Sequence, residues 1–229
     1  MKASILLYLD EHPPAREIFN GLISAGDIYL IGGVLREYKD HHSINDLRDI
    51  DIIVDVKNYH NWDDTIRRYS IKTNRFGGST LSCDDLIVDT WPLEQTWAYK
   101  QNLICCDPVS YFKMLTKTVF LNIDGIVYDW QREIWNEEEY QCAMKLRVLD
   151  VVLPQNPLLC LNILRTFILQ DRYQMKLSER LKQIILAEYN KAYSHSDFVD
   201  SLMAEQLRRY GKELVSRQGI EKKIHELNK

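Results

Sequence analysis

Hydrophobic and polar positions along the first 130 residues predict strands and helices that alternate. Residues 15–25 show the spacing of an amphipathic helix, which Gly26 ends. Hydrophobic runs predict strands at residues 28–31, 51–56, 69–76, 80–81 and 86–91. A polar helix is predicted at about residues 58–68, between the second and third of these strands. Interleaved strands and helices of this kind predict an α/β or α+β sheet domain.

After about residue 156 the pattern becomes helical throughout. Pro157 is expected to open a helix whose hydrophobic positions recur at helical spacing up to residue 168. Further helices are predicted at residues 177–193, 197–210 and 212–227. We therefore expect two domains, a mixed one over residues 1–150 and an all-α one over residues 151–229.

Charge is distributed unevenly between these two parts. The chain of 229 residues has a formal net charge of −4, but residues 151–229 carry 13 Lys and Arg against 9 Asp and Glu. An acidic N-terminal part and a basic C-terminal part are consistent with one half that holds a metal and one that faces phosphate, although charged helices are often simply solvated. Five cysteines without a CxxC pair argue against a zinc site or a disulfide framework.

A pair of glycines, Gly32 and Gly33, follows the first predicted strand and precedes a plausible helix start. A strand, a glycine turn and a helix N-terminus bring bare backbone N–H groups close to a ligand, which suits a phosphate. Arg36, one turn into the helix, could add a guanidinium. The alternative is that the glycines only form a tight turn.

Acidic residues lie at the start of one predicted strand and inside another. Asp49 and Asp51 are two residues apart, so they project from the same face of one strand. Asp89 lies within a later hydrophobic strand and either completes a cluster with them or only caps the end of its strand. Carboxylates this close repel each other unless a cation lies between them, and Mg²⁺ prefers one or two carboxylates plus phosphate oxygens.

The segment IYLIGGVLREY…LRDIDIIVDV resembles the head of the nucleotidyltransferase superfamily, in the branch of bacterial poly(A) polymerases and CCA-adding enzymes. Gly32, Gly33 and Arg36 match the glycine motif, and Asp49 and Asp51 match the Asp-x-Asp motif. The segment FGGSTLSCDDLIVDTW resembles the hairpin that follows and puts Asp89 at the third acidic position. The resemblance implies an α+β mixed sheet with flanking helices, followed by an all-α neck.

The same resemblance assigns roles to these residues. Asp49, Asp51 and Asp89 would be the catalytic, metal-binding acids, holding two Mg²⁺ ions that Mn²⁺ could replace. The two glycines and the arginine would bind the triphosphate, together with Arg165 in the neck. Arg165, Arg172 and Lys176 are spaced as on one helical face and could follow a nucleic-acid backbone or a triphosphate, although a solvated face explains them equally well.

Two motifs of the family are absent. Its Arg-Arg-Asp motif would fall at residues 118–120, which read Thr-Val-Phe, and its base-reading Glu-Asp-x-x-Arg motif aligns near Gln155 and Asn156. The chain also stops where the tRNA-gripping parts of the family would begin. Ordinary CCA addition is therefore not the activity that the sequence predicts.

The sequence predicts a metal-dependent, template-independent nucleotidyltransferase that moves NMP or dNMP from a nucleoside triphosphate to a hydroxyl. The acceptor could be RNA, DNA or a protein side chain, and oligonucleotide synthesis or 3′-end extension in antiphage defence is the first expectation. A nucleotidylating toxin acting on tRNA or protein, or a catalytically inactive nucleotide-binding regulatory subunit, is the alternative. A defence role would add an effector protein as partner. We expect a cytoplasmic protein without a membrane span of its own.

Overall fold

The computed structural model describes residues 1–228 except 45–48, 74–76, 84–85, 106 and 108–109. The chain divides into two compact units. The first unit contains residues 1–118 and 124–139, and the second contains residues 119–123 and 140–229. The predicted boundary at residue 150 lies within the second unit, where residues 148–149 pair with residues 176–177.

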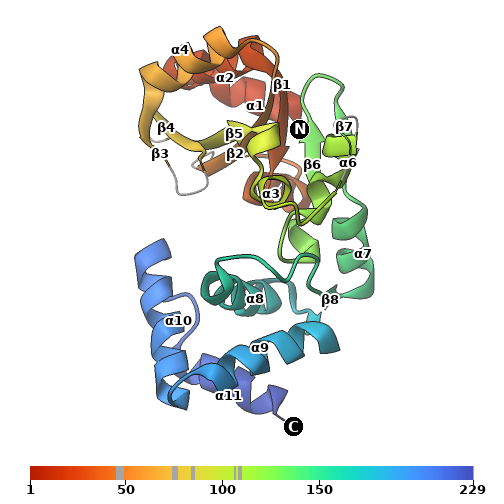
Figure 1. Cartoon of the computed structure of the whole chain (residues 1–229), viewed down its shortest axis with the longest axis vertical. Helices are drawn as coiled ribbons and strands as arrows, with labels where there is room; N and C mark the ends of the chain where they lie inside the picture. The colour runs from red at the N-terminus through yellow and green to blue at the C-terminus, as the bar shows by residue number, and fades with distance from the viewer. Residues whose placement is uncertain (45–48, 74–76, 84–85, 106, 108–109, 229) are drawn as a thin grey trace. The chain divides into compact units, whose positions relative to one another are not determined.

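A seven-stranded mixed sheet forms the first unit (Figure 1). Its spatial order is β3-β4-β5-β2-β1-β6-β7, and every neighbouring pair is antiparallel except β2 and β5, which run parallel. The strands are β1 (Gly26–Ile31), β2 (Asp49–Val56), β3 (Ser70–Thr73), β4 (Ser79–Cys83), β5 (Leu86–Pro92), β6 (Val127–Asp129) and β7 (Ile134–Asn136).

One face of this sheet is covered by α1 (Lys2–Glu11), α2 (Pro13–Ala25) and α4 (Tyr59–Tyr69) (Figure 1). Ile50, Ile52 and Val54 point from β2 into the resulting core and are at most 2% exposed. The alternation of buried and partly exposed residues along β2 is the period of two that a strand imposes. The acids at positions 49 and 51 therefore lie on the other face.

That other face is partly covered by the segment that follows β5. It contains η1 (Leu93–Gln95), α5 (Trp97–Lys100), α6 (Tyr111–Met114) and η3 (Leu115–Lys117). Leu93, Tyr99 and Leu115 from this segment form a buried cluster with Tyr29 and Ile53 of the central strands. The cluster fixes one part of the face, while α3 (Gly33–His41) contacts β1 and β2 next to the acids.

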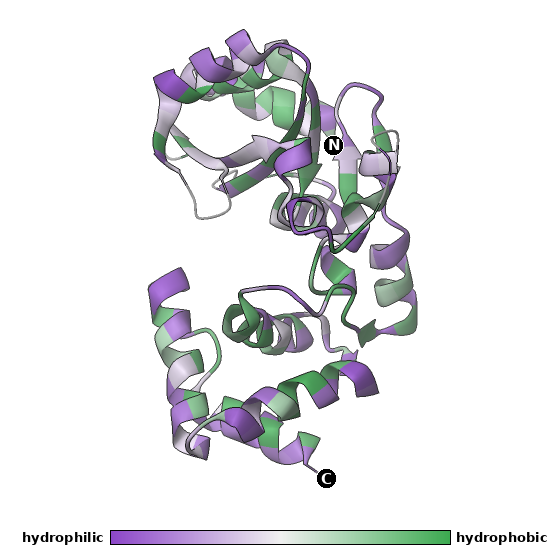
Figure 2. Cartoon of the chain, viewed as in Figure 1, coloured by the Kyte–Doolittle hydropathy of each residue, from purple (hydrophilic) through white to green (hydrophobic). Residues whose placement is uncertain are grey.

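The second unit is built mainly from helices. They are α7 (Glu138–Leu146), α8 (Leu159–Tyr173), α9 (Glu179–Lys191), α10 (His195–Tyr210) and α11 (Arg217–Leu227). In this unit, hydrophobic residues recur along α8 and α9 (Figure 2). The short 3-10 turn η4 (Asn122–Asp124) lies where the chain passes back to the first unit.

The predicted fold class is confirmed: a mixed sheet with flanking helices precedes a helical region. Three details of the prediction were wrong. A short parallel pair, β8 (Val148–Leu149) with β9 (Lys176–Leu177), interrupts the helices. Lys176 therefore lies in β9, beyond the end of α8, and does not share a helical face with Arg165 and Arg172. Helix α8 also begins two residues after Pro157, because the side chain of Asn156 accepts a hydrogen bond from the backbone N–H of Leu158.

Among the described residues, no helix combines the length and hydropathy that crossing a bilayer requires. The cysteines that the structure describes, at positions 83, 105, 142 and 160, are all free thiols.

Candidate active site

The two parallel strands in the middle of the sheet bring Asp51 and Asp89 side by side. Asp51 of β2 is paired in register with Asp89 of β5. Paired residues on neighbouring strands point to the same face, and adjacent strands lie about 4.8 Å apart. Both side chains are partly exposed. The structure therefore places these two predicted acids together, on the face opposite α2 and α4.

Asp49 begins β2 and lies on the same face as Asp51, one pleat away. It is exposed and is paired with Ile87 rather than with an acid. In the described part of the chain, no three His, Cys, Asp or Glu side chains are close enough together to hold a metal ion by themselves. Asp51 and Asp89 are thus the adjacent pair, and Asp49 extends it toward solvent.

The glycine turn packs directly against this pair. Gly32 has φ +79° and ψ −143°, a conformation that residues with a Cβ rarely adopt. A Cβ added to Gly32 would lie 2.6 Å from Oδ2 of Asp51, closer than real Cβ contacts come. Because β1 and β2 are antiparallel and Ile31 is paired with Asp51, the turn after Ile31 must pass beside the carboxylate. Only glycine allows that approach.

Helix α3 begins at this turn, and no side chain of the described residues caps its N-terminus. Gly32 is the N-cap residue and Gly33 the first residue of the helix. As far as the described residues show, the space beside Gly33 is open, since the nearest atom to an added Cβ would be Nη2 of Arg36 at 3.9 Å. Backbone N–H groups at an uncapped helix N-terminus carry partial positive charge and are suited to an anion.

Arg36 is held by a partner that the sequence did not predict. It is 8% exposed and its Nη1 forms an ion pair with Oδ1 of Asp124, which is 9% exposed. Its Nε is buried and has no hydrogen-bond partner among the described residues. Asp124 in the segment NIDGIVYD belongs to no periodic pattern, so only the tertiary structure shows that it neutralises part of the charge of Arg36.

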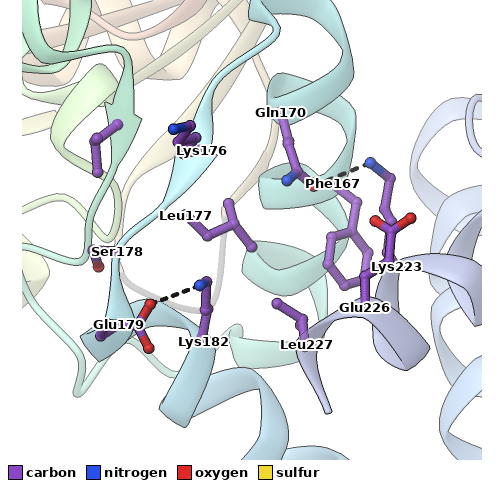
Figure 3. A pocket seen from close by; sticks show the side chains of 11 residues that line it. Phe167, Gln170, Lys176, Leu177, Ser178, Glu179, Lys182, Lys223, Glu226 and Leu227 are labelled. Carbon is purple, nitrogen blue, oxygen red and sulfur yellow. Dashed lines mark hydrogen bonds and ion pairs between the residues drawn. The ribbon is translucent and has the colours of Figure 1, made fainter. Parts of the chain in front are cut away.

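Arg165, the fourth predicted nucleotide contact, lies on α8 in the second unit and is partly exposed. The same unit contains a cavity of about 500 Å³ with Phe167 and Leu177 among its apolar lining residues (Figure 3). Lys182 and Lys223 also line it. The ammonium group of Lys182 is paired with Glu179, and that of Lys223 is paired with Gln170 and Asp171. Two of the three lysines that line the cavity are therefore already paired, and the third is Lys176.

Comparisons with known proteins show likeness in structure only. No family model matches the sequence, and a comparison with curated proteins finds no match either. A CCA-adding enzyme solved with CTP has a TM-score of 0.60 and 14% identity, over 93% of this chain and 52% of that one. The CCA-adding enzyme of Thermotoga maritima, solved with tRNA, has a TM-score of 0.56 and 15% identity, over 88% and 47%.

A tRNA-processing enzyme in an apo form has a TM-score of 0.56 and 16% identity, over 89% of this chain and 57% of that one. This chain thus spans about half the length of the solved structures it resembles. The resemblance to poly(A) polymerases and CCA-adding enzymes predicted from the sequence therefore holds for the fold. The chain has the head-and-neck fold found in CCA-adding nucleotidyltransferases.

Proposed function

We propose that the protein is a metal-dependent, template-independent nucleotidyltransferase. It transfers NMP or dNMP from a nucleoside triphosphate to a hydroxyl and releases pyrophosphate. The observation that carries this proposal is the in-register pair of Asp51 and Asp89 beside the Gly32 turn. The shared fold supports it, because similar structures include CCA-adding enzymes solved with ATP and with CTP.

The acidic pair fits Mg²⁺ bound together with a substrate. Mg²⁺ is usually held by one or two carboxylates, with phosphate oxygens and water completing the octahedron. Asp51 and Asp89 would supply the carboxylates, and Asp49 would supply a third on the solvent side, for the two ions that the sequence resemblance implies. Bound Mg²⁺, or Mn²⁺ in its place, would supply charge stabilisation at the phosphate oxygens and make the acceptor hydroxyl more acidic.

The N-terminus of α3 is the proposed seat of the triphosphate. Its N–H groups at Gly32 and Gly33 would donate to phosphate oxygens, and the described residues leave room for them beside Gly33. The guanidinium of Arg36 borders the same space, since its Nη2 lies 3.9 Å from the position of a Cβ at Gly33, and it would add a charged donor. Asp124 holds the same guanidinium in place, so Arg36 acts from a fixed position.

The chemical step needs in-line attack and a proton acceptor. The hydroxyl oxygen of the acceptor forms a bond to the α-phosphorus, the bond from that phosphorus to the bridging oxygen breaks, and pyrophosphate leaves with the electron pair. Asp89 is the proposed acceptor of the hydroxyl proton or the ligand beside that oxygen. The contribution of the protein is mainly to position and stabilise charge, as in other phosphoryl transfers.

RNA is the acceptor class that the comparisons favour. Two of the similar structures, a CCA-adding enzyme and a tRNA nucleotidyltransferase, were solved with tRNA. The sequence resemblance also predicts that Arg165 of α8 binds the nucleotide. Transfer to the protein itself or to another protein would instead indicate a toxin-like activity, and free oligonucleotides would indicate synthesis of the kind used in antiphage defence, with an effector protein as the receiver.

The test is incubation of the full chain with each labelled NTP and dNTP, with Mg²⁺ or Mn²⁺, and with RNA, DNA or no added acceptor. We expect pyrophosphate release that Asp51→Asn and Asp89→Asn each abolish. The control is Asp55→Asn, which removes a carboxylate farther along β2 and leaves the rate unchanged. Absence of both pyrophosphate release and labelled product with every acceptor would refute the proposal.

A nucleotide-binding subunit without catalysis is the second candidate. It is favoured by Thr118 and Phe120 standing where the family has its Arg-Arg-Asp motif, since Phe120 is buried and cannot bind a nucleotide as an acid does. Calorimetry separates the two candidates. Triphosphate binding without turnover, unaffected by Asp89→Asn, would favour the binding subunit.

A further inference from the structure

A transverse row of paired residues crosses the sheet at the proposed site. Asp51 of β2 is paired with Asp89 of β5, and Asp89 is paired on its other side with Thr80 of β4. All three side chains therefore point to the same face. Thr80 is 2% exposed, and its hydroxyl donates a hydrogen bond to Oδ1 of Asp89.

This hydrogen bond limits how the Asp89 carboxylate can rotate. Threonine is β-branched, so its own χ1 angle is stiff, and burial between neighbouring strands restricts it further. A hydroxyl that donates to a carboxylate makes a charge-assisted bond, which is stronger than a neutral one. One oxygen of Asp89 is thereby held on the β4 side of the row, away from Asp51.

We propose that Thr80 is a positioning residue that orients Asp89 for metal binding. The inference rests on the function proposed above and adds the residue that fixes the geometry of the third acid. Thr80 acts only through Asp89 and touches neither the metal nor the substrate. Groups that orient metal ligands matter because a carboxylate free to rotate must be ordered when the ion binds.

The neighbouring Thr90 provides a matched control. It follows Asp89 on β5, so its side chain lies on the opposite face of the sheet. It is 0% exposed, and its Oγ1 has no hydrogen-bond partner among the described residues. Replacing either threonine by valine conserves shape, but only at Thr80 does the change remove a hydrogen bond to an acid.

The experiment measures Mn²⁺ binding to the full chain with a saturating non-hydrolysable triphosphate by electron paramagnetic resonance, together with the Mn²⁺ dependence of pyrophosphate release. We expect Thr80→Val to raise the dissociation constant of Mn²⁺ about 10-fold, within the range known for groups that orient metal ligands. Thr80→Ser keeps the hydroxyl, so its dissociation constant for Mn²⁺ should stay within about 2-fold of the wild-type value, well below the loss expected for Thr80→Val. Thr90→Val should bind Mn²⁺ as the wild type does.

The outcomes separate the inference from the proposed function. If Thr80→Val is folded by circular dichroism and binds Mn²⁺ as the wild type does, the positioning role is wrong even where the wild type releases pyrophosphate. If Thr80→Val weakens Mn²⁺ binding but the wild type releases no pyrophosphate, the positioning role stands and the catalytic proposal fails. A wild-type chain that binds no Mn²⁺ overturns the inference.

Discussion

Replacing Gly32 by alanine should disable the site with little damage to the rest of the fold. The new methyl group would lie 2.6 Å from Oδ2 of Asp51, whereas ordinary contacts begin at 3.4 Å. The carboxylate would therefore have to move by about 0.8 Å, or the turn would have to open by as much. Holding a residue with a Cβ in this conformation costs about 1–3 kcal/mol in addition.

The predicted loss of activity follows from that displacement. Misplacing a catalytic group by about 1 Å can reduce a rate about 100-fold, because alignment of the reacting atoms is lost. We therefore expect Gly32→Ala to lower the rate of pyrophosphate release by about two orders of magnitude. The unfolding free energy should fall by only about 1–3 kcal/mol, measured by urea denaturation.

Gly211 is the matched control for backbone strain. It also has a positive φ, +66°, but an added Cβ would meet no atom within 4 Å. Gly211→Ala should reduce stability by about 1–2 kcal/mol, the usual penalty for a left-handed residue, and leave the rate unchanged. Full activity in a folded Gly32→Ala variant, or equal losses of activity in both variants, would refute the reasoning that ties this turn to Asp51.

Three further predictions concern other parts of the chain. Asp124→Ala should lower the unfolding free energy by about 3–5 kcal/mol in urea denaturation, because it leaves Arg36 charged and buried without a counterion; a loss below about 1 kcal/mol would contradict this. Burial, and then the nearby carboxylates, raises the pKa of Tyr29 to about 12. The folded protein keeps this proton where the unfolded chain loses it, so stability should fall by about 1.4 kcal/mol per pH unit between pH 10 and 12, and Tyr29→Phe should flatten that slope. Arg165→Ala should raise the KM for the triphosphate in steady-state assays, whereas Arg172→Ala should leave it unchanged. Equal KM values for the two variants would contradict a role of Arg165 in nucleotide binding.

The strands that carry the acids could be predicted because their patterns are strong. In β2, polar and hydrophobic residues alternate at the start of the strand, so the common face of Asp49 and Asp51 follows from the period of two. The position of Asp89 opposite Asp51 depends on strand order and register, which a single sequence does not determine. The family resemblance, rather than periodicity, supplied that step.

Other features had no local signal. Helix α1 buries only Ile5 and Leu9 deeply and leaves Leu7 exposed, so its pattern is not clearly amphipathic. The partner of Arg36 lies 88 residues away, and long-range ion pairs leave no trace in sequence spacing. Lys176 was placed on one helical face with Arg165 and Arg172, but α8 ends at Tyr173, where Gln174, with φ 50°, takes the left-handed position that glycine more often occupies.

The most direct test of the central claim is where a divalent ion binds. Crystals of the full chain grown with Mn²⁺ and a non-hydrolysable triphosphate would locate the ion by anomalous diffraction. The proposed site predicts an anomalous peak between the carboxylates of Asp51 and Asp89, with the triphosphate at the N-terminus of α3. A triphosphate bound elsewhere, or bound at α3 with no peak at this pair, would contradict it.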